Sequence, residues 1–347
     1  MAAALKVIVA GAGVLGLTSA LALARAGARV VLTDPAQLGD SASGVAAGML
    51  APVFEAALDP LAAPHFDLLL AARDLWPELA ESTGVALDRT GAMAVGSGER
   101  LERLVTALAA LGARGERLTP EAAAARAPGV APTEAGGLFT GEDWRIDPDQ
   151  ALTALAEAAA EAGVEIRRAP LHPQEACDWR LLATGADRVP GGLAPELARL
   201  EPIKGHILRA PGVRYQGAVV RGEGIYLTPG AGGLVIGASM ERGAHDRAVD
   251  PAQVERLAQA GRALFPALAG AELAAGVGVR AASADGLPLV GFSRTAGVMM
   301  AAGARRNGWL LAPLVAQIVT ALVFGADPGP YAARMAPERL EPGGGAF

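Results

Sequence analysis

The sequence predicts a discontinuous α/β domain with an inserted α+β domain built on antiparallel sheet. Three observations support this fold class. The first 35 residues alternate strand, glycine-rich turn, helix and strand, the order of a βαβ unit in a parallel sheet. Residues 205–240 hold short apolar runs broken by glycine and proline, which is typical of antiparallel strands. From Val277 onward the pattern returns to the α/β style.

The opening βαβ unit carries the turn GAGVLG between the strand LKVIVA and a helix from Val14 to Ala26, which Gly27 caps. The second strand is ARVVLTDP, and it ends in Asp34, about 20 residues after the turn, where a dinucleotide site requires an acid. Such an acid accepts hydrogen bonds from the adenosine ribose, and the helix N-terminus faces the phosphates. We therefore expect this Rossmann-like unit to bind a dinucleotide through these residues: Gly11, Ala12, Gly13, Val14, Leu15, Gly16 and Asp34.

NAD and FAD share this turn, so the residues beyond it must distinguish the two cofactors. An NAD domain normally continues with βαβ repeats, whereas here residues 39–50 form a run of small residues, GDSASGVAAGML. That run is too polar for a core strand and too rich in glycine for a stable helix, and it suits backbone contact with a large flat ligand. A helix at Pro148–Ala162, the strand VEIRR and the strand WRLLATG at 179–185 come later in the chain. The last strand breaks at small residues that suit passage beside a dinucleotide.

The inserted domain is expected to contain the strands GHILRA, GAVVRG, GIYLTP and GLVIGASM, followed by a helix at Pro251–Phe265. We assign residues 1–84, 140–200 and 278–335 to the cofactor domain. Residues 85–139 and 201–277 form the substrate domain, and residues 336–347 a C-terminal tail.

Composition and charge exclude several classes of protein. A net charge of −6 provides no basic field for nucleic acid, and one cysteine is compatible with a reducing, cytoplasmic compartment. The apolar run 307–326 predicts a helix from Pro313 that ends before Gly325, about 18 Å long. A bilayer core needs about 30 Å, so we expect a buried helix and no membrane anchor. The histidines are scattered, and no metal-ligand cluster stands out.

Several blocks resemble one family, in family order and over nearly the whole chain. They are GAGVLG with Asp34, SASGVAAGML leading to Glu55, IKGHIL, GIYLTP, GLVIGASM, GVRAASADGLPLVG and AAGARRNGWLLAP. Together they resemble the glycine oxidase branch, linked to thiamine biosynthesis, of the D-amino-acid oxidase family of FAD enzymes. AAGML and RNGWLLAP are the most specific pieces.

The resemblance implies an FAD-dependent oxidase that converts glycine, sarcosine or a small D-amino acid to an imine, which water hydrolyses, while O2 is reduced to hydrogen peroxide. It implies that Arg280 and Tyr226 hold the substrate carboxylate, that Met240 lines the substrate pocket and that Arg306 is a second active-site arginine. Cys177 lies far from the position where related sarcosine oxidases attach flavin, so noncovalent FAD is expected. Further residues expected at the cofactor are Ser43, Ala46, Ala47, Gly48, Met49, Leu50, Thr184, Gly185, Arg306, Asn307, Gly308, Trp309 and Leu310.

The chain also departs from the family pattern. Gly224 stands where glycine oxidases place a histidine, two residues before Tyr226, and Arg305 adds a positive charge before Arg306. The connection between Ile166 and Trp179 is shorter than usual, which leaves the adenine pocket undefined. Substrate choice therefore stays open, and a preference for D-aspartate or D-glutamate is one option.

The chemistry agrees with the assignment of Arg280. Hydride transfer to a flavin needs a carboxylate held beside the ring, and a planar guanidinium holds a carboxylate through two parallel hydrogen bonds. Two other functions stay open: an amine or amino-acid dehydrogenase that passes electrons to a quinone or partner protein, and a flavin-binding subunit without catalysis. The sequence also leaves homo-oligomerisation open.

Overall fold

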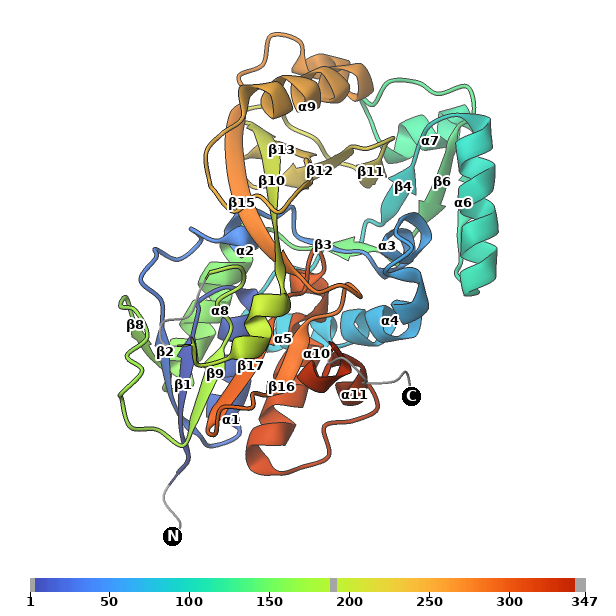
Figure 1. Ribbon diagram of the computed structural model, residues 1–347. Coiled ribbons are helices and arrows are strands. Elements are labelled where there is room, and N and C mark those ends of the chain that lie inside the picture. The colour runs from blue at the N-terminus through green and yellow to red at the C-terminus, as the bar shows by residue number, and fades with distance from the viewer. Residues whose placement is uncertain (1–3, 188–191, 341–347) are drawn as a thin grey trace.

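The computed structural model describes residues 4–187 and 192–340, which form two large sheets with helices packed around each (Figure 1). Residues 341–347 of the expected C-terminal tail lie outside the described part, as do residues 188–191 of the expected cofactor domain. Described residues of that tail form a short 3-10 helix, Pro337–Leu340.

The first sheet contains the expected βαβ unit at its centre. Its strands run parallel except for one antiparallel pair at the edge, β16 with β17. β1 and β2 are almost wholly buried because helices cover them, which explains their continuous apolar sequences. In order across the sheet the strands are β16 (Leu289–Phe292), β17 (Val298–Ala302), β9 (Trp179–Leu182), β1 (Lys6–Ala10), β2 (Arg29–Thr33) and β8 (Glu165–Arg167).

Helix α1 (Val14–Arg25) packs between α8 (Pro148–Glu161) and α10 (Gly308–Phe324). Its alanine and leucine side chains permit close approach, and most of the helix is buried. Smaller helices in this half of the molecule are α4 (Phe66–Asp74), α5 (Trp76–Thr83) and α11 (Ala332–Met335), and α3 (Pro52–Leu58) packs between α4 and α6 (Gly98–Leu111).

The second sheet is largely antiparallel, as expected, with one parallel pair between β4 and β11. α9 (Pro251–Leu264) packs on β10 and β13, and α6 (Gly98–Leu111) packs on β6, while α7 (Pro120–Arg126) contacts β5. In order the strands are β14 (Glu241–Arg242), β10 (Glu201–Ala210), β13 (Gly233–Gly237), β12 (Tyr226–Gly230), β11 (Val219–Arg221), β4 (Ala92–Ala94), β6 (Gly137–Thr140) and β5 (Glu116–Leu118).

Strand β15 (Ala274–Ala282) also pairs with β10, over its whole length, and descends from the upper half of the molecule to the lower half in Figure 1. Residue 278, where we expected the cofactor domain to resume, therefore lies inside a strand of the second sheet. The chain rejoins the first sheet at β16.

The run of small residues at 39–50 is not entirely irregular. It contains a one-turn helix, α2 (Ala42–Val45), and a short strand, β3 (Met49–Leu50), that pairs with β7 (Trp144–Arg145). The sequence prediction of no helix was wrong here, because the Ser41 hydroxyl accepts a hydrogen bond from the Gly44 N–H at 3.4 Å and caps this single turn.

Helix α10 begins at Gly308, so the predicted start at Pro313 was wrong. Proline inside a helix leaves the carbonyl four residues earlier without its N–H donor. Here that carbonyl belongs to Trp309, and the buried indole N–H of Trp76 donates to it at 3.0 Å. A tertiary contact thus replaces the missing backbone bond. Among the residues that the structure describes, no helix has the length and hydropathy needed to cross a membrane.

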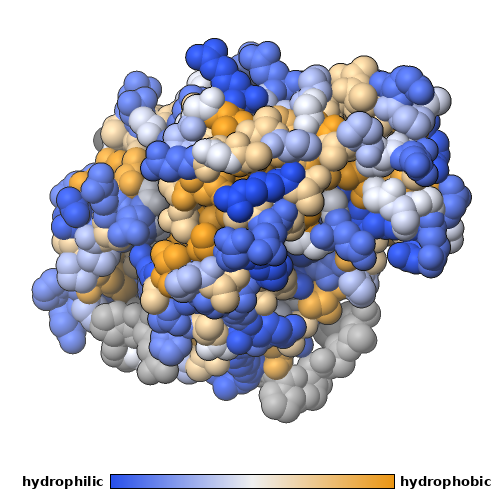
Figure 2. All heavy atoms as spheres, turned by 90° about the horizontal axis from the view of Figure 1, so that it is seen from above, coloured by the Kyte–Doolittle hydropathy of each residue, from blue (hydrophilic) through white to orange (hydrophobic). Residues whose placement is uncertain are grey.

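The end of the molecule that carries α9 is covered mainly by hydrophilic residues, with smaller apolar areas between them (Figure 2). α9 buries Leu257, Ala258 and Gly261 against the second sheet. The apolar face of this helix is therefore already used by the sheet beneath it.

Candidate functional site

A cavity of about 350 Å³ opens at the carboxyl ends of the first sheet. Ala10, Thr33, Ala183 and Ala302 line it, at or just after the ends of β1, β2, β9 and β17. The chain leaves β1 toward β2 on one side and later returns to β9 on the other, so the strand order reverses between β1 and β9. Ligands of open α/β sheets bind at this kind of position.

The glycine turn forms one wall of the cavity. Gly11 has φ +107°, and a Cβ there would overlap the carbonyl oxygen of Ala183 on the neighbouring strand. A Cβ on Gly16 would overlap the Gly11 carbonyl oxygen. The Asp34 carboxylate accepts hydrogen bonds from the Ala12 N–H at 2.7 Å and the Ala36 N–H at 2.9 Å. Asp34 thus holds the turn while it also lines the cavity.

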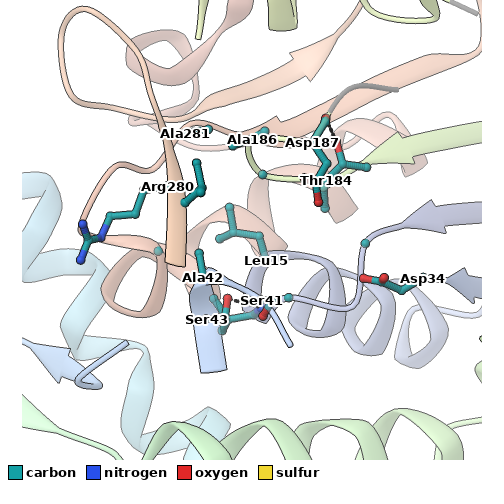
Figure 3. Close-up of a pocket in the computed structure, with 18 of the residues that line it drawn as sticks. Leu15, Asp34, Ser41, Ala42, Ser43, Thr184, Ala186, Asp187, Arg280 and Ala281 are labelled. Atoms are coloured by element: carbon teal, nitrogen blue, oxygen red, sulfur yellow. Dashed lines mark hydrogen bonds between the residues drawn. The ribbon is translucent and has the colours of Figure 1, made fainter. Parts of the chain in front are cut away.

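The segment around α2 forms the facing wall (Figure 3). The Ser43 hydroxyl accepts from the Val14 N–H at 3.1 Å, at the start of α1, and the Ser43 carbonyl accepts from the Trp309 indole at 3.1 Å. A Cβ on Gly13 would stand 3.2 Å from the Ser43 hydroxyl oxygen, inside the space between the two walls. The absence of a side chain at Gly13 keeps this space open.

Many of the residues expected at the cofactor line this cavity: Gly11, Gly13, Val14, Leu15, Asp34, Ser43, Ala46, Thr184, Gly185, Arg306, Gly308 and Trp309. The others lie behind its walls or beside it: Ala12, Gly16, Ala47, Gly48, Met49, Leu50, Asn307 and Leu310. Leu50 and Leu310 belong to the hydrophobic core of the first domain, so their side chains face away from the cavity.

Arg280 and Asp34 lie at opposite ends of the cavity (Figure 3). Arg280 is half-buried, and its Nη1 is fully buried without a hydrogen-bond partner among the described residues. Burial lowers the pKa of Arg280 below its usual value, and the nearby charge of Arg306 adds to this effect. A buried, unpartnered guanidinium is a site for an anionic ligand.

Tyr226 belongs to the same face of the second sheet as Arg280. Residues paired across neighbouring strands share a face, and so do alternate residues along a strand. Tyr226 pairs with Gly237, Gly237 with Ile207, and Ile207 with Gly276, four residues before Arg280 on β15. Burial raises the pKa of the Tyr226 hydroxyl above 10.0. Tyr226 therefore stays protonated near neutral pH and can donate a hydrogen bond.

Two glycines make room for these side chains. A Cβ on Gly205 would overlap the Arg280 guanidinium, and a Cβ on Gly237 would overlap the Tyr226 hydroxyl. Gly205 lies inside β10, where glycine is normally unfavourable, and Gly237 is the last residue of β13. The neighbouring side chains explain why glycine stands there.

Arg306 is already paired with acidic residues. Its guanidinium donates to Glu55 at 2.8 Å and to Asp59 at 3.0 Å, and both carboxylates are buried. Arg305, at φ +52°, also pairs with Asp59. Burial opposes ionisation of Asp59, yet the hydrogen bond from Arg305 and the charge of Arg306 hold its pKa below 3.8. Neither arginine is left without a carboxylate partner.

Met240 and Gly224 lie away from the cavity. Met240 is 39 % exposed and does not line it, so a pocket role for Met240 stays a prediction. Gly224 occupies an exposed turn at φ +66° between β11 and β12. The turn brings no side chain toward Tyr226 from this position.

Sequence reasoning missed part of the lining. Pro170 and Leu171, from the shortened connection, line the cavity near the Asp34 end of the site, where the Thr33 hydroxyl bonds to the Ala169 carbonyl. Asp187 and Arg247 line its mouth. The rule that ligands meet the carboxyl ends of parallel strands could have located the lining at Thr33 and Ala302.

The arrangement fits a dinucleotide that carries a flat ring. The acid at Asp34, the side-chain-free space at Gly13 and the unpartnered guanidinium at Arg280 follow one another along the cavity. A family model described as DAO, FAD dependent oxidoreductase, matches residues 6–322. The chain belongs to this family. It is an FAD-dependent oxidoreductase similar to glycine oxidases.

Individual relatives agree with this family assignment. The chain is 31 % identical to a glycine oxidase of Geobacillus kaustophilus, over 91 % of this chain and 92 % of the relative. It is 30 % identical to a thiamine biosynthesis oxidoreductase, ThiO, of Rhizobium etli, described as putative, over 90 % and 94 %. The crystal structure of glycine oxidase from Geobacillus kaustophilus superposes with a TM-score of 0.84 at 28 % identity and covers 97 % of this chain and 100 % of that one. The predicted fold class is therefore confirmed.

Proposed function

We propose that this FAD-dependent oxidoreductase oxidises glycine or a small D-amino acid to the imine, which water hydrolyses to a 2-oxo acid and ammonia. The substrate loses two electrons and one proton as a hydride from the α carbon and a second proton from the amine nitrogen, and these two electrons and two protons reduce O2 to hydrogen peroxide. The observation that carries the proposal is Arg280, which lines the end of the cavity opposite Asp34 and whose side chain has no hydrogen-bond or ion-pair partner among the described residues. The glycine oxidases among the relatives support the choice of substrate.

We infer that FAD is held noncovalently along the cavity. Asp34 would accept hydrogen bonds from the ribose, and the turn around Gly13 would meet the pyrophosphate. The bound flavin would supply the acceptor for a hydride from the substrate carbon. Cys177 is partly buried and does not line the cavity, which supports the absence of a covalent link.

The protein's own residues position the substrate. Arg280 would hold the substrate carboxylate through two parallel hydrogen bonds, and the protonated Tyr226 hydroxyl would donate another. Held in this way, the α carbon would have one orientation relative to the cofactor site, which lowers the entropic part of the barrier. Glu55 and Asp59 hold the Nε and Nη2 atoms of Arg306, so its Nη1 and its charge would be what it offers the substrate.

The relative named as a thiamine biosynthesis oxidoreductase, ThiO, supports a role for this chain in thiamine biosynthesis. The second candidate, a dehydrogenase that reduces a quinone or partner protein, is distinguished by its acceptor. Anaerobic bleaching of the flavin by an amino-acid panel tests the reaction, and the amount of peroxide formed in air tests the acceptor. Failure of every amino acid in the panel to bleach the flavin contradicts the proposed function.

Replacing Arg280 by Ala tests whether this residue holds the substrate carboxylate. The change removes charge-assisted hydrogen bonds worth roughly 1.5–3 kcal/mol each, so kcat/KM for glycine or D-alanine should fall at least about a hundredfold. Flavin content should stay near that of the parent, and benzylamine, which has no carboxylate, should lose little. Equal losses on all substrates would mean that Arg280 supports the fold instead.

A further inference from the structure

Arg221, at the end of β11, is a second buried guanidinium without a partner. The residue is only 9 % exposed, and its Nε is buried without a hydrogen-bond partner. Within the described residues its side chain takes part in no hydrogen bond or ion pair, and its guanidinium carbon lies 6.0 Å from the Tyr226 ring centroid. Burying such a charge is costly unless something compensates it.

Arg221 faces the same side of the second sheet as the substrate clamp. It pairs directly with Tyr226 across β11 and β12, and paired residues share a face. The row continues through Gly237 and Ile207 to β15, which carries Arg280. Tyr226 therefore lies on a strand between the strands of the two unpartnered arginines.

The other cations near Tyr226 are already engaged. Arg209 and Arg306 also act on the Tyr226 hydroxyl through their charges. Arg209, however, donates to the carbonyls of Gly44 and Val45, and Arg306 is paired with buried carboxylates. One substrate carboxylate would satisfy Arg280, and Arg221 would still lack a partner.

Asp143 is an acid whose charge attracts Arg221, but the two side chains form no hydrogen bond or ion pair. Asp143 is buried and accepts hydrogen bonds from the N–H groups of Val53 at 2.8 Å and Phe54 at 3.0 Å, at the start of α3. Its attraction to Arg221 acts over a longer distance, and burial raises the pKa of Asp143 to about 6. Asp143 lowers the cost of burying Arg221 without occupying its hydrogen-bond donors.

We propose that Arg221 binds a second carboxylate of the substrate, so that the preferred substrate is an amino acid with an acidic side chain. This inference rests on the proposed function, because it takes Arg280 as the clamp for the α-carboxylate. A guanidinium is suited to this task since it stays charged and presents several donors in one plane. Arg305 is the other cation that could bind an acidic side chain of the substrate, but it is paired with Asp59.

Ligand binding tests the proposal without turnover. Acetate and propionate are compared with malonate and succinate by the change each causes in the absorbance of the bound flavin. The parent should bind the better dicarboxylate at least about tenfold more tightly than the better monocarboxylate, since a second charge-assisted bond forms. Arg221→Gln should abolish this preference and leave monocarboxylate binding unchanged, whereas Arg221→Lys should retain part of it.

Kinetics provide the second measurement. Arg221→Gln should lower kcat/KM for D-aspartate or D-glutamate at least about tenfold relative to glycine and D-alanine. Flavin content and Tm, measured for both variants, establish that each is folded. If the Lys variant alone folds, loss of part of the dicarboxylate preference in that variant supports the proposal, and an unchanged preference overturns it.

The outcomes separate the inference from the proposed function. If glycine or D-alanine bleaches the flavin but the parent shows no dicarboxylate preference, or Arg221→Gln weakens both ligand classes equally, the inference is wrong and the proposed function stands. If no amino acid bleaches the flavin, the proposed function is wrong, and the preference for dicarboxylate ligands still decides whether Arg221 binds a carboxylate.

Discussion

Gly205 on β10 leaves the space that the Arg280 guanidinium occupies beside it. We expect Gly205→Ala to displace Arg280, because the new Cβ would overlap the guanidinium while the surrounding strand pairs on both sides and cannot easily shift. KM for the amino acid should rise at least about tenfold, the loss of roughly one charge-assisted hydrogen bond.

Steady-state kinetics and flavin content measure this effect. Gly232→Ala is the matched control, since a Cβ there meets no atom within 4 Å and the backbone has no left-handed φ. An unchanged KM in Gly205→Ala would show that Arg280 does not contact the substrate at its present position.

At the scale of elements, the start of α10 depends on a side chain from α5. The Trp76 indole satisfies the carbonyl that Pro313 leaves without a donor. Trp76→Phe should destabilise the protein by roughly 1–3 kcal/mol, because a buried acceptor loses its partner. Tm at saturating flavin measures the loss, which should amount to a few degrees.

The Pro313→Ala background separates this bond from the smaller volume of phenylalanine. Alanine restores a backbone N–H that can bond to the Trp309 carbonyl, so Trp76→Phe should cost less there than in the parent. An equal cost in both backgrounds would assign the whole effect to packing.

The ion pairs between the end of α3 and the loop before α10 should make the stability of the folded protein depend on pH. Asp59 has a pKa below 3.8 in the folded state, so its contribution is present above the unfolded pKa and is lost as pH falls below about 4. Asp59→Asn should be less stable than the parent near neutral pH, and the difference should shrink in acid.

Thermal unfolding of the two proteins across pH measures that difference. Glu99→Gln is the control, because its carboxylate is 83 % exposed and pairs with Arg103, which is 63 % exposed. A difference between Asp59→Asn and the parent that is constant with pH would mean that Asp59 contributes through packing and not through its charge.

In the molecule as a whole, the cofactor cavity lies at the carboxyl ends of the first sheet and beside β15 of the second, and its described lining contains no cysteine. We therefore expect acid precipitation to release intact FAD into the supernatant, leaving a colourless pellet. Chromatography of the supernatant identifies the flavin. Retention of yellow flavin in the pellet would contradict noncovalent binding. A cytoplasmic location and a homo-oligomer stay predictions.

Features that depend on neighbours in the sequence were predictable. The βαβ unit, the glycine turn and Asp34 follow from local periodicity and from the short reach between a strand end and the next helix. Within the second sheet, β10 to β13 were predicted from the alternation of apolar residues and from glycine and proline at their ends, whereas β4, β5, β6 and β14 were not. Arg280 was assigned by resemblance, and its position at the cavity agrees with that assignment.

The sequence by itself thus determined the α/β fold class, the dinucleotide turn and the family, because each depends on residue patterns that persist over short stretches. Only the tertiary structure decided where α10 begins, which arginines are paired and which stand alone. Trp76 and Pro313 are distant in the chain, as are Asp59 and Arg305, and Arg221 and Arg280 lie on separate strands of the second sheet. The partner of a buried charge, or of a carbonyl that lacks its helical N–H donor, is usually distant in the sequence. Which residue it is depends on tertiary packing, so local sequence patterns do not predict it.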